Sequence, residues 1–317
     1  MDLLFLSSDP ISIDCLQALA GGQIPGVKVS GVITNPDRRS GRGKKLQQNV
    51  VAAQAEELGL PILQTPKLSA DEIATLHSFD AALVFAFGQI LPRSVLSLRP
   101  GLFLNIHASP LPQLRGPSPI ETAIAEGWTQ TEISLMRMVQ RMDAGDIALR
   151  QTIPIGSDET GHGLRKIIAA QSALLLQQIQ KVTSPHYQWE AQAEKQATWC
   201  RKITKADACL DFSHSAQTLV NQSRAFDVWP GSTVEIGGEM MKVTDIHKST
   251  HSGQPGEVLS AGEQLIIAAG EDSVSIGKIQ RPSRKMIPFA EFQRTSPIQP
   301  RTLLTYPCSV PFVRSHF

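Results

Sequence analysis

The chain has 317 residues, of which 41% are hydrophobic and 19% are charged, and its formal net charge is +1. This length and composition exclude a disordered chain and make two domains the expectation. A net charge so close to zero also excludes a positive field over the whole molecule, so a nucleic-acid partner would have to be recognised by local patches.

Cysteine spacing and hydropathy indicate the compartment. The cysteines, Cys15, Cys200, Cys209 and Cys308, lack CxxC spacing, which argues against a structural zinc site or a disulfide framework and favours a reducing compartment. The sequence contains no run of about 18 apolar residues, so no membrane helix is expected. The N-terminal residues 1–6 read as a first strand and not as a signal peptide. We therefore expect a cytoplasmic protein with no metal and no membrane segment.

Apolar runs alternate with helix-like segments over the first 183 residues, which predicts a doubly wound, mostly parallel α/β sheet. The expected strands are 3–6, 27–34, 61–63 and 81–87; the expected helices are 11–19, 50–58, 71–77 and 161–182, and 153–160 is expected to be a loop. The turn Ser7-Ser8-Asp9-Pro10 after the first strand lacks the glycines of a dinucleotide fingerprint, so a nicotinamide cofactor is not expected.

Polar side chains in the stretch from Gly101 to Asp146 form a candidate active site. Asn105 and His107 end an apolar strand and share one face of it, because residues two apart on a strand project together. Asp143 follows the next apolar run and would reach the same pocket if the two strands are neighbours. An amide, an imidazole and a carboxylate suit acyl transfer. The alternative is a buried core histidine and a turn-forming aspartate, and spacing alone does not decide between them.

A cluster of cations and glycines follows the second strand. Arg38, Arg42, Lys44 and Lys45 belong to this loop, and such side chains neutralise nucleic-acid phosphates. Short basic runs are often only solvated surface, and from composition alone that interpretation is favoured.

The C-terminal part has a different sequence pattern from the first 183 residues. Residues 184–203 read as a linker, and a helix over 215–226 is followed by short strands at 233–236, 240–246, 256–260, 265–268 and 274–279. Strands of this length separated by glycine turns predict a small OB-like barrel over 204–294. Arg281, Arg284 and Lys285 form a basic edge beside it. The Pro-rich tail, 295–317, has no assigned role and is expected to be mobile or to wrap the surface.

Several motifs resemble one family. Asn-Ile-His-Ala-Ser from Asn105, Arg115-Gly116, and Met-Asp-Ala-Gly-Asp around Asp143 are similar to the formyltransferases that use 10-formyltetrahydrofolate, and the barrel sequence is similar to their C-terminal domain. The basic loop resembles the one by which methionyl-tRNA formyltransferases engage the acceptor arm of initiator tRNA. The turn Ser7–Pro10, Pro110 and Leu114 depart from the family pattern.

The resemblance implies roles for the site residues. Asn105, His107 and Asp143 would be catalytic. The folate co-substrate would be bound by the following residues: Phe87, Gly88, Ile90, Leu91, Ser109, Pro110, Leu111 and Pro112. The tRNA would be bound by the basic loop and the basic edge: Arg38, Arg42, Lys44, Lys45, Arg281, Arg284 and Lys285.

The resemblance also implies the reaction, which is transfer of the formyl group of 10-formyltetrahydrofolate to the amino group of initiator methionyl-tRNA by a monomer. One alternative is a formyltransferase that acts on a small amine, such as glycinamide ribonucleotide or a nucleotide-linked amino sugar. A second is a non-catalytic tRNA-binding relative. A metal-dependent hydrolase is disfavoured because no ligand set has suitable spacing.

Overall fold

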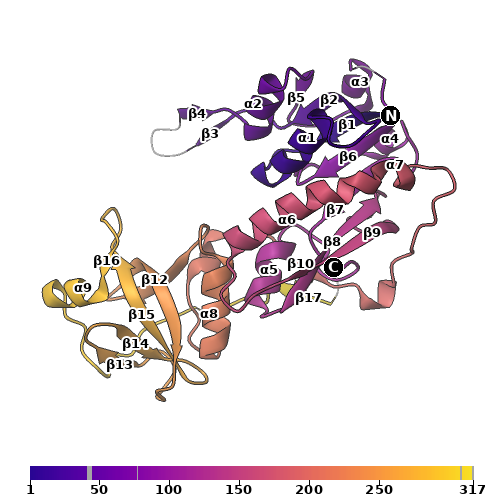
Figure 1. Ribbon diagram of the computed structural model, residues 1–317. Helices are drawn as coiled ribbons and strands as arrows, with labels where there is room; N and C mark the ends of the chain where they lie inside the picture. Colours follow the sequence, from indigo (N-terminus) through magenta and orange to yellow (C-terminus); the bar gives the residue numbers. More distant parts are fainter. Residues whose placement is uncertain (41–44, 77, 308, 316–317) are drawn as a thin grey trace.

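The larger part of the protein is built around a seven-stranded sheet (Figure 1). In the computed structural model, residues 1–40, 45–76, 78–307 and 309–315 are described. The strands lie in the order β5 (Ile62–Gln64), β2 (Lys28–Thr34), β1 (Asp2–Leu6), β6 (Ala81–Phe85), β7 (Phe103–His107), β8 (Gln130–Arg137) and β9 (Ile147–Pro154). Neighbouring strands from β5 to β7 are parallel, whereas β8 is antiparallel to both β7 and β9.

Helices cover both faces of this sheet, which explains why its central strands are continuously apolar. Leu3 and Phe5 point into the core shared with α1, α5 and α6, while Leu4 and Leu6 point into the core beneath α3 and α4. The helices are α1 (Ile13–Ala20), α2 (Val50–Glu57), α3 (Ala70–Ala74), α4 (Arg93–Leu96), α5 (Pro119–Ala125), α6 (Gly161–Leu175) and α7 (Ile179–Val182). The predicted doubly wound, mostly parallel sheet is confirmed.

Three local expectations differ from the structure. Strand β9 was not predicted, because it is a partly exposed edge strand whose hydrophobic signal is interrupted by Arg150. The long helix predicted over 161–182 is divided by a 3₁₀ turn at Leu176–Gln178. The basic loop after β2 is flanked by two short strands, β3 (Arg38–Ser40) and β4 (Lys45–Gln47), which pair antiparallel.

A smaller antiparallel half-barrel follows, as the sequence predicted. Its strands are β11 (Ser232–Ile236), β12 (Glu239–Ser249), β13 (Val258–Ala261), β14 (Leu265–Ala268) and β15 (Ser273–Gln280), with β16 (Ile287–Pro288) paired to β15. Helices α8 (Ala216–Ala225) and α9 (Phe289–Thr295) accompany it, and α9 was not expected. The half-barrel has its own core, which includes Phe212, Ile276 and Phe289.

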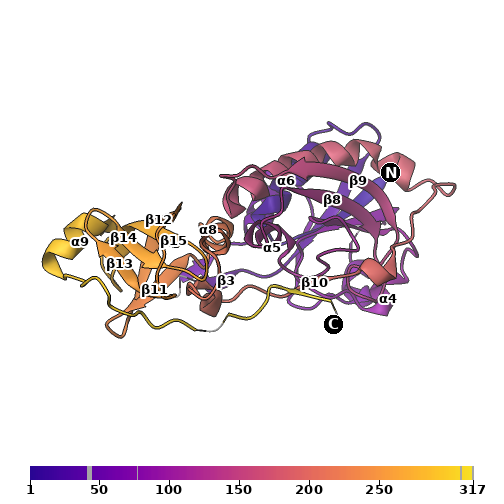
Figure 2. The ribbon, with the colours of Figure 1, turned by 90° about the horizontal axis from the view of Figure 1, so that it is seen from below.

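The two parts are joined by packing as well as by the chain. Helix α8 packs against α5, and Phe226 at the end of α8 is buried in the core of the larger part. Strand β10 (Trp199–Cys200) and strand β17 (Val313–Arg314) pair at the surface of the larger part, so the segment around β17 returns there from the half-barrel (Figures 1 and 2). From the two cores we propose a division into 1–183, a connecting segment 184–203, a half-barrel 204–294 and a tail 295–317.

Candidate active site

A cavity of about 390 Å³ lies where β6 and β7 end. Its wall is formed by the segment after β6, by the end of β7, by the start of α5, by the loop after β8, and by side chains from the first turn and from α6. The following residues contribute, among others: Asp9, Phe87, Gly88, Ile90, Asn105, His107, Gly116, Glu121, Met142, Asp143 and Arg165. The carboxyl ends of parallel strands are the usual ligand edge of such sheets.

Asn105 and His107 both line this cavity, as their spacing on one strand predicted. Each is less than a tenth exposed. Within the described part of the chain, no residue forms a hydrogen bond with the side-chain amide of Asn105, so this group is available to a ligand. His107 Nε2 lies 2.9 Å from the carbonyl oxygen of Leu114. Because a carbonyl only accepts, this contact places a hydrogen on Nε2 and leaves Nδ1 to face the cavity.

Asp143 meets His107, although by a different route from the one expected. The prediction assumed that both strands end at one edge, but β8 is antiparallel and ends beside the start of β7. The loop after β8 returns along the sheet and brings Asp143 Oδ2 to 3.8 Å from His107 Nδ1. The same oxygen accepts the Gly116 N–H at 2.8 Å. The imidazole is therefore oriented by the Leu114 carbonyl, and Asp143 supplies a negative charge opposite Nδ1.

The connecting segment before β10 forms hydrogen bonds with two loops of the site, the one that contains Arg115 and the one that contains Asp143. Gln192 Nε2 donates to the carbonyl oxygens of Asp143 and Gly145, at 2.8 and 2.7 Å. Arg115 is 1% exposed; its guanidinium donates to Gln192 Oε1 and pairs with Glu194 at 3.0 Å. A buried charge of this kind is tolerated only with such partners. No sequence pattern predicted that this segment supports the site.

The segment after β6 forms a largely apolar wall of the cavity. Phe87, Gly88 and Ile90 line it, as predicted, whereas Leu91 packs in the core beneath α4. The backbone turns here through Gly88, whose φ is +75°, and the Phe87 carbonyl is held by Asn35 Nδ2 at 3.0 Å. Apolar side chains with fixed backbone donors and acceptors fit a flat heterocycle such as a pterin.

The turn Ser109–Pro112 does not line the cavity, in contrast to the folate contacts expected of it. Ser109 Oγ donates to the Gln113 carbonyl, and Leu111 packs in a small core with Met136. The side chains of Ser109 and Leu111 are therefore engaged in local contacts away from the cavity.

The cavity wall contains an ion cluster that no sequence pattern predicted. Arg165 pairs with Asp9 at 2.6 Å and with Glu121 at 3.2 Å. Burial acts to lower the pKa of Arg165, but attraction to these carboxylates outweighs it and holds the pKa above the usual value. The three residues come from distant segments, so no local pattern could reveal the cluster. Asp9 lies in the turn where the sequence departs from the family pattern.

The predicted tRNA-binding cations lie on two surfaces. Arg38 and Lys45 are exposed on the β3–β4 hairpin, which projects on the side where the half-barrel lies (Figures 1 and 2). Arg42 and Lys44 lie outside the described residues. Arg281, Arg284 and Lys285 are exposed beyond β15, where the Arg281 guanidinium donates to Ser296 and lies over the Phe292 ring.

A buried thiol, Cys200, lies close to the loop of the site. Burial raises the pKa of the Cys200 thiol to about 12, so this neighbour of the loop is a neutral thiol and a poor nucleophile. Among the described residues, no group of three or more His, Cys, Asp or Glu side chains could hold a metal ion. The described helices are all too short or too polar to cross a membrane.

Two sequence models of one family match the chain. The model described as formyl transferase matches residues 4–179, and the model described as formyl transferase, C-terminal domain, matches residues 202–297. With the sheet and the Asn–His–Asp cavity, these matches define the chain as a formyltransferase.

Curated relatives match this chain over nearly its full length. The chain is 33% identical over 310 residues to a methionyl-tRNA formyltransferase of Citrifermentans bemidjiense, covering 96% of each chain. It is 34% identical over 285 residues to a methionyl-tRNA formyltransferase of Geobacter sulfurreducens, covering 88% of this chain and 90% of the relative. The chain belongs to the methionyl-tRNA formyltransferase family.

A solved structure shares the fold. It is a sugar 3N-formyltransferase in the presence of dTDP and 5-N-formyltetrahydrofolate, with a TM-score of 0.66 and 16% identity, covering 90% of this chain and 99% of that one. At this identity the likeness concerns the fold alone.

Proposed function

We propose that the protein transfers the formyl group of 10-formyltetrahydrofolate to the α-amino group of initiator methionyl-tRNA. The observation that carries the proposal is the meeting of Asn105, His107 and Asp143 at one cavity in a chain whose relatives are methionyl-tRNA formyltransferases. The alternative of a small-amine acceptor has only a likeness of fold to support it. The three polar side chains at the cavity argue against a non-catalytic relative.

Asn105 and His107 have different roles in the reaction: Asn105 stabilises the negative charge that develops, and His107 transfers a proton. A free α-amine has a pKa of about 8, so a useful fraction is neutral near pH 7 and needs no strong base. The Asn105 amide donates to the oxyanion that forms at the formyl carbon. His107 Nδ1 accepts the proton of the attacking amine and passes it to the nitrogen that leaves. During this step Asp143 faces the imidazolium and stabilises its charge.

The apolar wall after β6 would hold the folate. Phe87 and Ile90 provide apolar contact for a heterocycle, and main-chain groups around Gly88 provide hydrogen bonds. When bound, 10-formyltetrahydrofolate supplies the activated formyl group. The residues Leu91 and Ser109–Pro112 would support this pocket from behind and would not touch the ligand.

The tRNA would be bound by local cations, because the net charge of +1 provides no general attraction. Arg38 and Lys45 on the hairpin, with Arg42 and Lys44 between them in sequence, would contact phosphates of the acceptor arm. Arg281, Arg284 and Lys285 would contact the tRNA from the half-barrel. We further propose that the enzyme acts as a monomer and that it works in the cytoplasm, where charged tRNA is used.

The proposal is tested by supplying both substrates. The protein is incubated with 10-formyltetrahydrofolate and methionine-charged initiator or elongator tRNA, and N-formylmethionine is measured after hydrolysis of the ester. Formylation of initiator tRNA in preference to elongator tRNA is expected. Formylation of glycinamide ribonucleotide or a nucleotide-linked amino sugar, with none of methionyl-tRNA, would contradict the proposal. Binding of tRNA without any turnover would instead indicate a non-catalytic relative.

A further inference from the structure

The tail of the chain joins both parts of the molecule. Leu304 is buried in the core of the half-barrel, and the Leu304 N–H donates to the Gly256 carbonyl at 2.9 Å. Further on, the Ser309 N–H donates to Asp211 Oδ2 at 2.7 Å. Strand β17 then pairs with β10 on the larger part, where Phe312 also packs against the main core. We call residues 309–315 the C-terminal strap.

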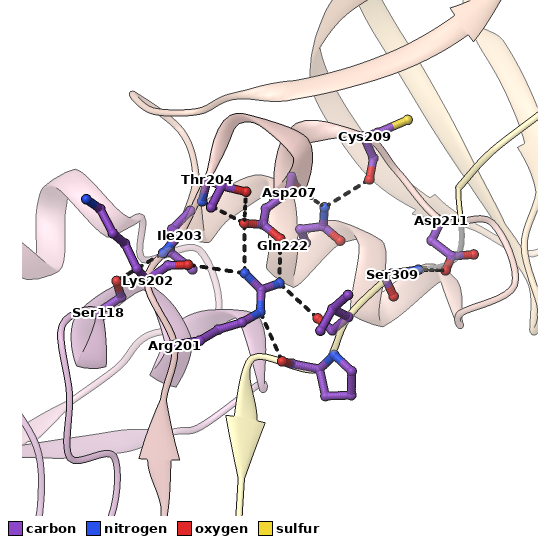
Figure 3. Close-up of polar contacts among 12 residues, drawn as sticks. Ser118, Arg201, Lys202, Ile203, Thr204, Asp207, Cys209, Asp211, Gln222 and Ser309 are labelled. Carbon is purple, nitrogen blue, oxygen red and sulfur yellow. Dashed lines mark hydrogen bonds and ion pairs between the residues drawn. The ribbon is translucent and has the colours of Figure 1, made fainter. Parts of the chain in front are cut away.

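Arg201 is the residue through which the strap is attached (Figure 3). Its guanidinium donates to the carbonyl oxygens of Val310 and Pro311, at 2.9 and 3.1 Å, and forms an ion pair with Asp207. The same group lies 4.8 Å from the centre of the Phe312 ring. Phe312 in turn contacts Phe226 edge to face, at 5.6 Å between ring centres. Arg201 thus contacts the strap, η4 (Lys205–Ala208) and the ring that packs on the end of α8.

Strand β10, which pairs with the strap, also holds the loop of the active site. The Cys200 N–H donates to the Arg115 carbonyl at 2.8 Å, and the Arg115 N–H donates to the Thr198 carbonyl at 2.9 Å. The Leu114 N–H donates to Thr198 Oγ1 at 3.0 Å. The carbonyl of this same Leu114 accepts the hydrogen bond that orients His107.

The loop and β10 are in very close contact. A Cβ atom on Gly116 would lie 2.4 Å from the Cys200 carbonyl oxygen, so the two backbones meet where only glycine fits. A shift of β10 would therefore be transmitted to Gly116, whose N–H is bound by Asp143. Interiors packed this closely transmit strain instead of absorbing it.

We propose that the C-terminal strap, attached through Arg201, is a positioning element for the formyl-transfer site. It completes a two-stranded pair with β10 and thereby fixes the Leu114 carbonyl and Gly116, which set the positions of His107 and Asp143. No residue of the strap is among those that line the cavity. This role rests on the proposed function, because it concerns the rate of that reaction.

The test compares the full chain with a chain that ends at Ser309 and with Arg201→Lys. A lysine keeps the positive charge, but its single ammonium cannot span Asp207 and two carbonyls. Arg314→Ala is the matched control, since Arg314 is exposed in the strap and its backbone pairing is kept. The truncation leaves Leu304 in place, so the core of the half-barrel is retained.

We expect kcat to fall by about tenfold in the truncated chain and by less in Arg201→Lys. The KM for methionyl-tRNA should stay within about twofold in both variants, because small displacements at a reacting centre affect turnover more than binding. Hydrogen exchange of the Leu114 and Arg115 amides should be faster in both variants and unchanged in Arg314→Ala.

The exchange measurement does not depend on substrate, so it separates this proposal from the proposed function. Faster exchange in a protein that lacks activity would support the positioning role of the strap and contradict the proposed formyl transfer. Unchanged exchange and unchanged kcat in the truncated chain would overturn the positioning role. If the truncated chain does not fold, Arg201→Lys decides by the same two measurements. A lower unfolding temperature with normal kcat and normal exchange would show that the strap is only structural.

Discussion

His107 Nδ1 lies 3.8 Å from Asp143 Oδ2, and that oxygen is itself held by the Gly116 N–H at 2.8 Å. The carboxylate is therefore anchored before any substrate is bound, and its remaining acceptor capacity faces the imidazole. The carboxylate thus faces the ring nitrogen that would accept the proton of the attacking amine.

Removing that charge should slow the proton transfer. In Asp143→Asn the amide oxygen still accepts from Gly116, so the loop is kept, but the imidazolium loses its counter-charge. We expect kcat to fall by about 10²-fold or more, with KM for methionyl-tRNA little changed. Initial rates with saturating folate measure this. A variant with normal turnover would show that Asp143 has only a structural role.

Asn105 and His107 should each be required for turnover. Loss of a single oxyanion donor costs about 10²–10³ in kcat, and we expect at least this loss in Asn105→Ala and in His107→Ala. Both side chains lie at a strand end beside a cavity, so truncation should leave the sheet intact. Thermal unfolding of each variant serves as the control. Near-normal rates in both would remove the proposed site.

The hairpin cations should govern the salt dependence of tRNA use. In a combined Arg38→Ala and Lys45→Ala variant, we expect a higher KM for methionyl-tRNA and a log–log salt slope reduced by about 1–2, because fewer phosphates are neutralised. KM for the folate should not change. Lys28→Ala is the control, since Lys28 is exposed at the start of β2, at the opposite end of that strand from the hairpin. An unaltered slope would contradict the assignment of the hairpin.

Local sequence patterns predicted the parts of the site that a single strand determines. The shared face of Asn105 and His107 follows from the two-residue period of β7, whereas the wall at Phe87 and Gly88 was expected only from the resemblance to the family. The direction of β8 is not encoded in its own pattern, so the route of Asp143 to His107 could not be predicted.

Contacts between distant segments were also beyond local patterns. The bond that orients His107 is made by a backbone carbonyl, which leaves no mark on residue type. The pairing of Arg165 with Asp9 joins a helix to a turn far away in the chain. Strap pairing with β10 involves two residues on each side, too few to give a periodic signal.

The attachment of the strap should depend on pH through two carboxylates. Burial acts to raise the pKa of Asp207, but hydrogen bonds from Arg201 and Thr204 outweigh it and hold the pKa below the usual range. Asp211 is affected in the same way, where bonds from Ser213 and Ser309 outweigh burial. A lowered pKa in the folded state contributes stability above the unfolded pKa of about 3.9, and this is lost as pH falls through the folded value.

We therefore expect the free energy of unfolding to fall by an amount on the order of 1–3 kcal/mol that involves these carboxylates, as the pH is lowered from about 5 through their lowered folded pKa values. In Asp207→Asn this part of the decrease should be smaller, because the amide does not titrate, although the variant should be less stable at neutral pH. Urea unfolding at a series of pH values measures it, with Asp71→Asn, at an exposed position on α3, as the control. An identical pH dependence in Asp207→Asn and the unaltered chain would show that the Arg201–Asp207 pair does not hold the strap.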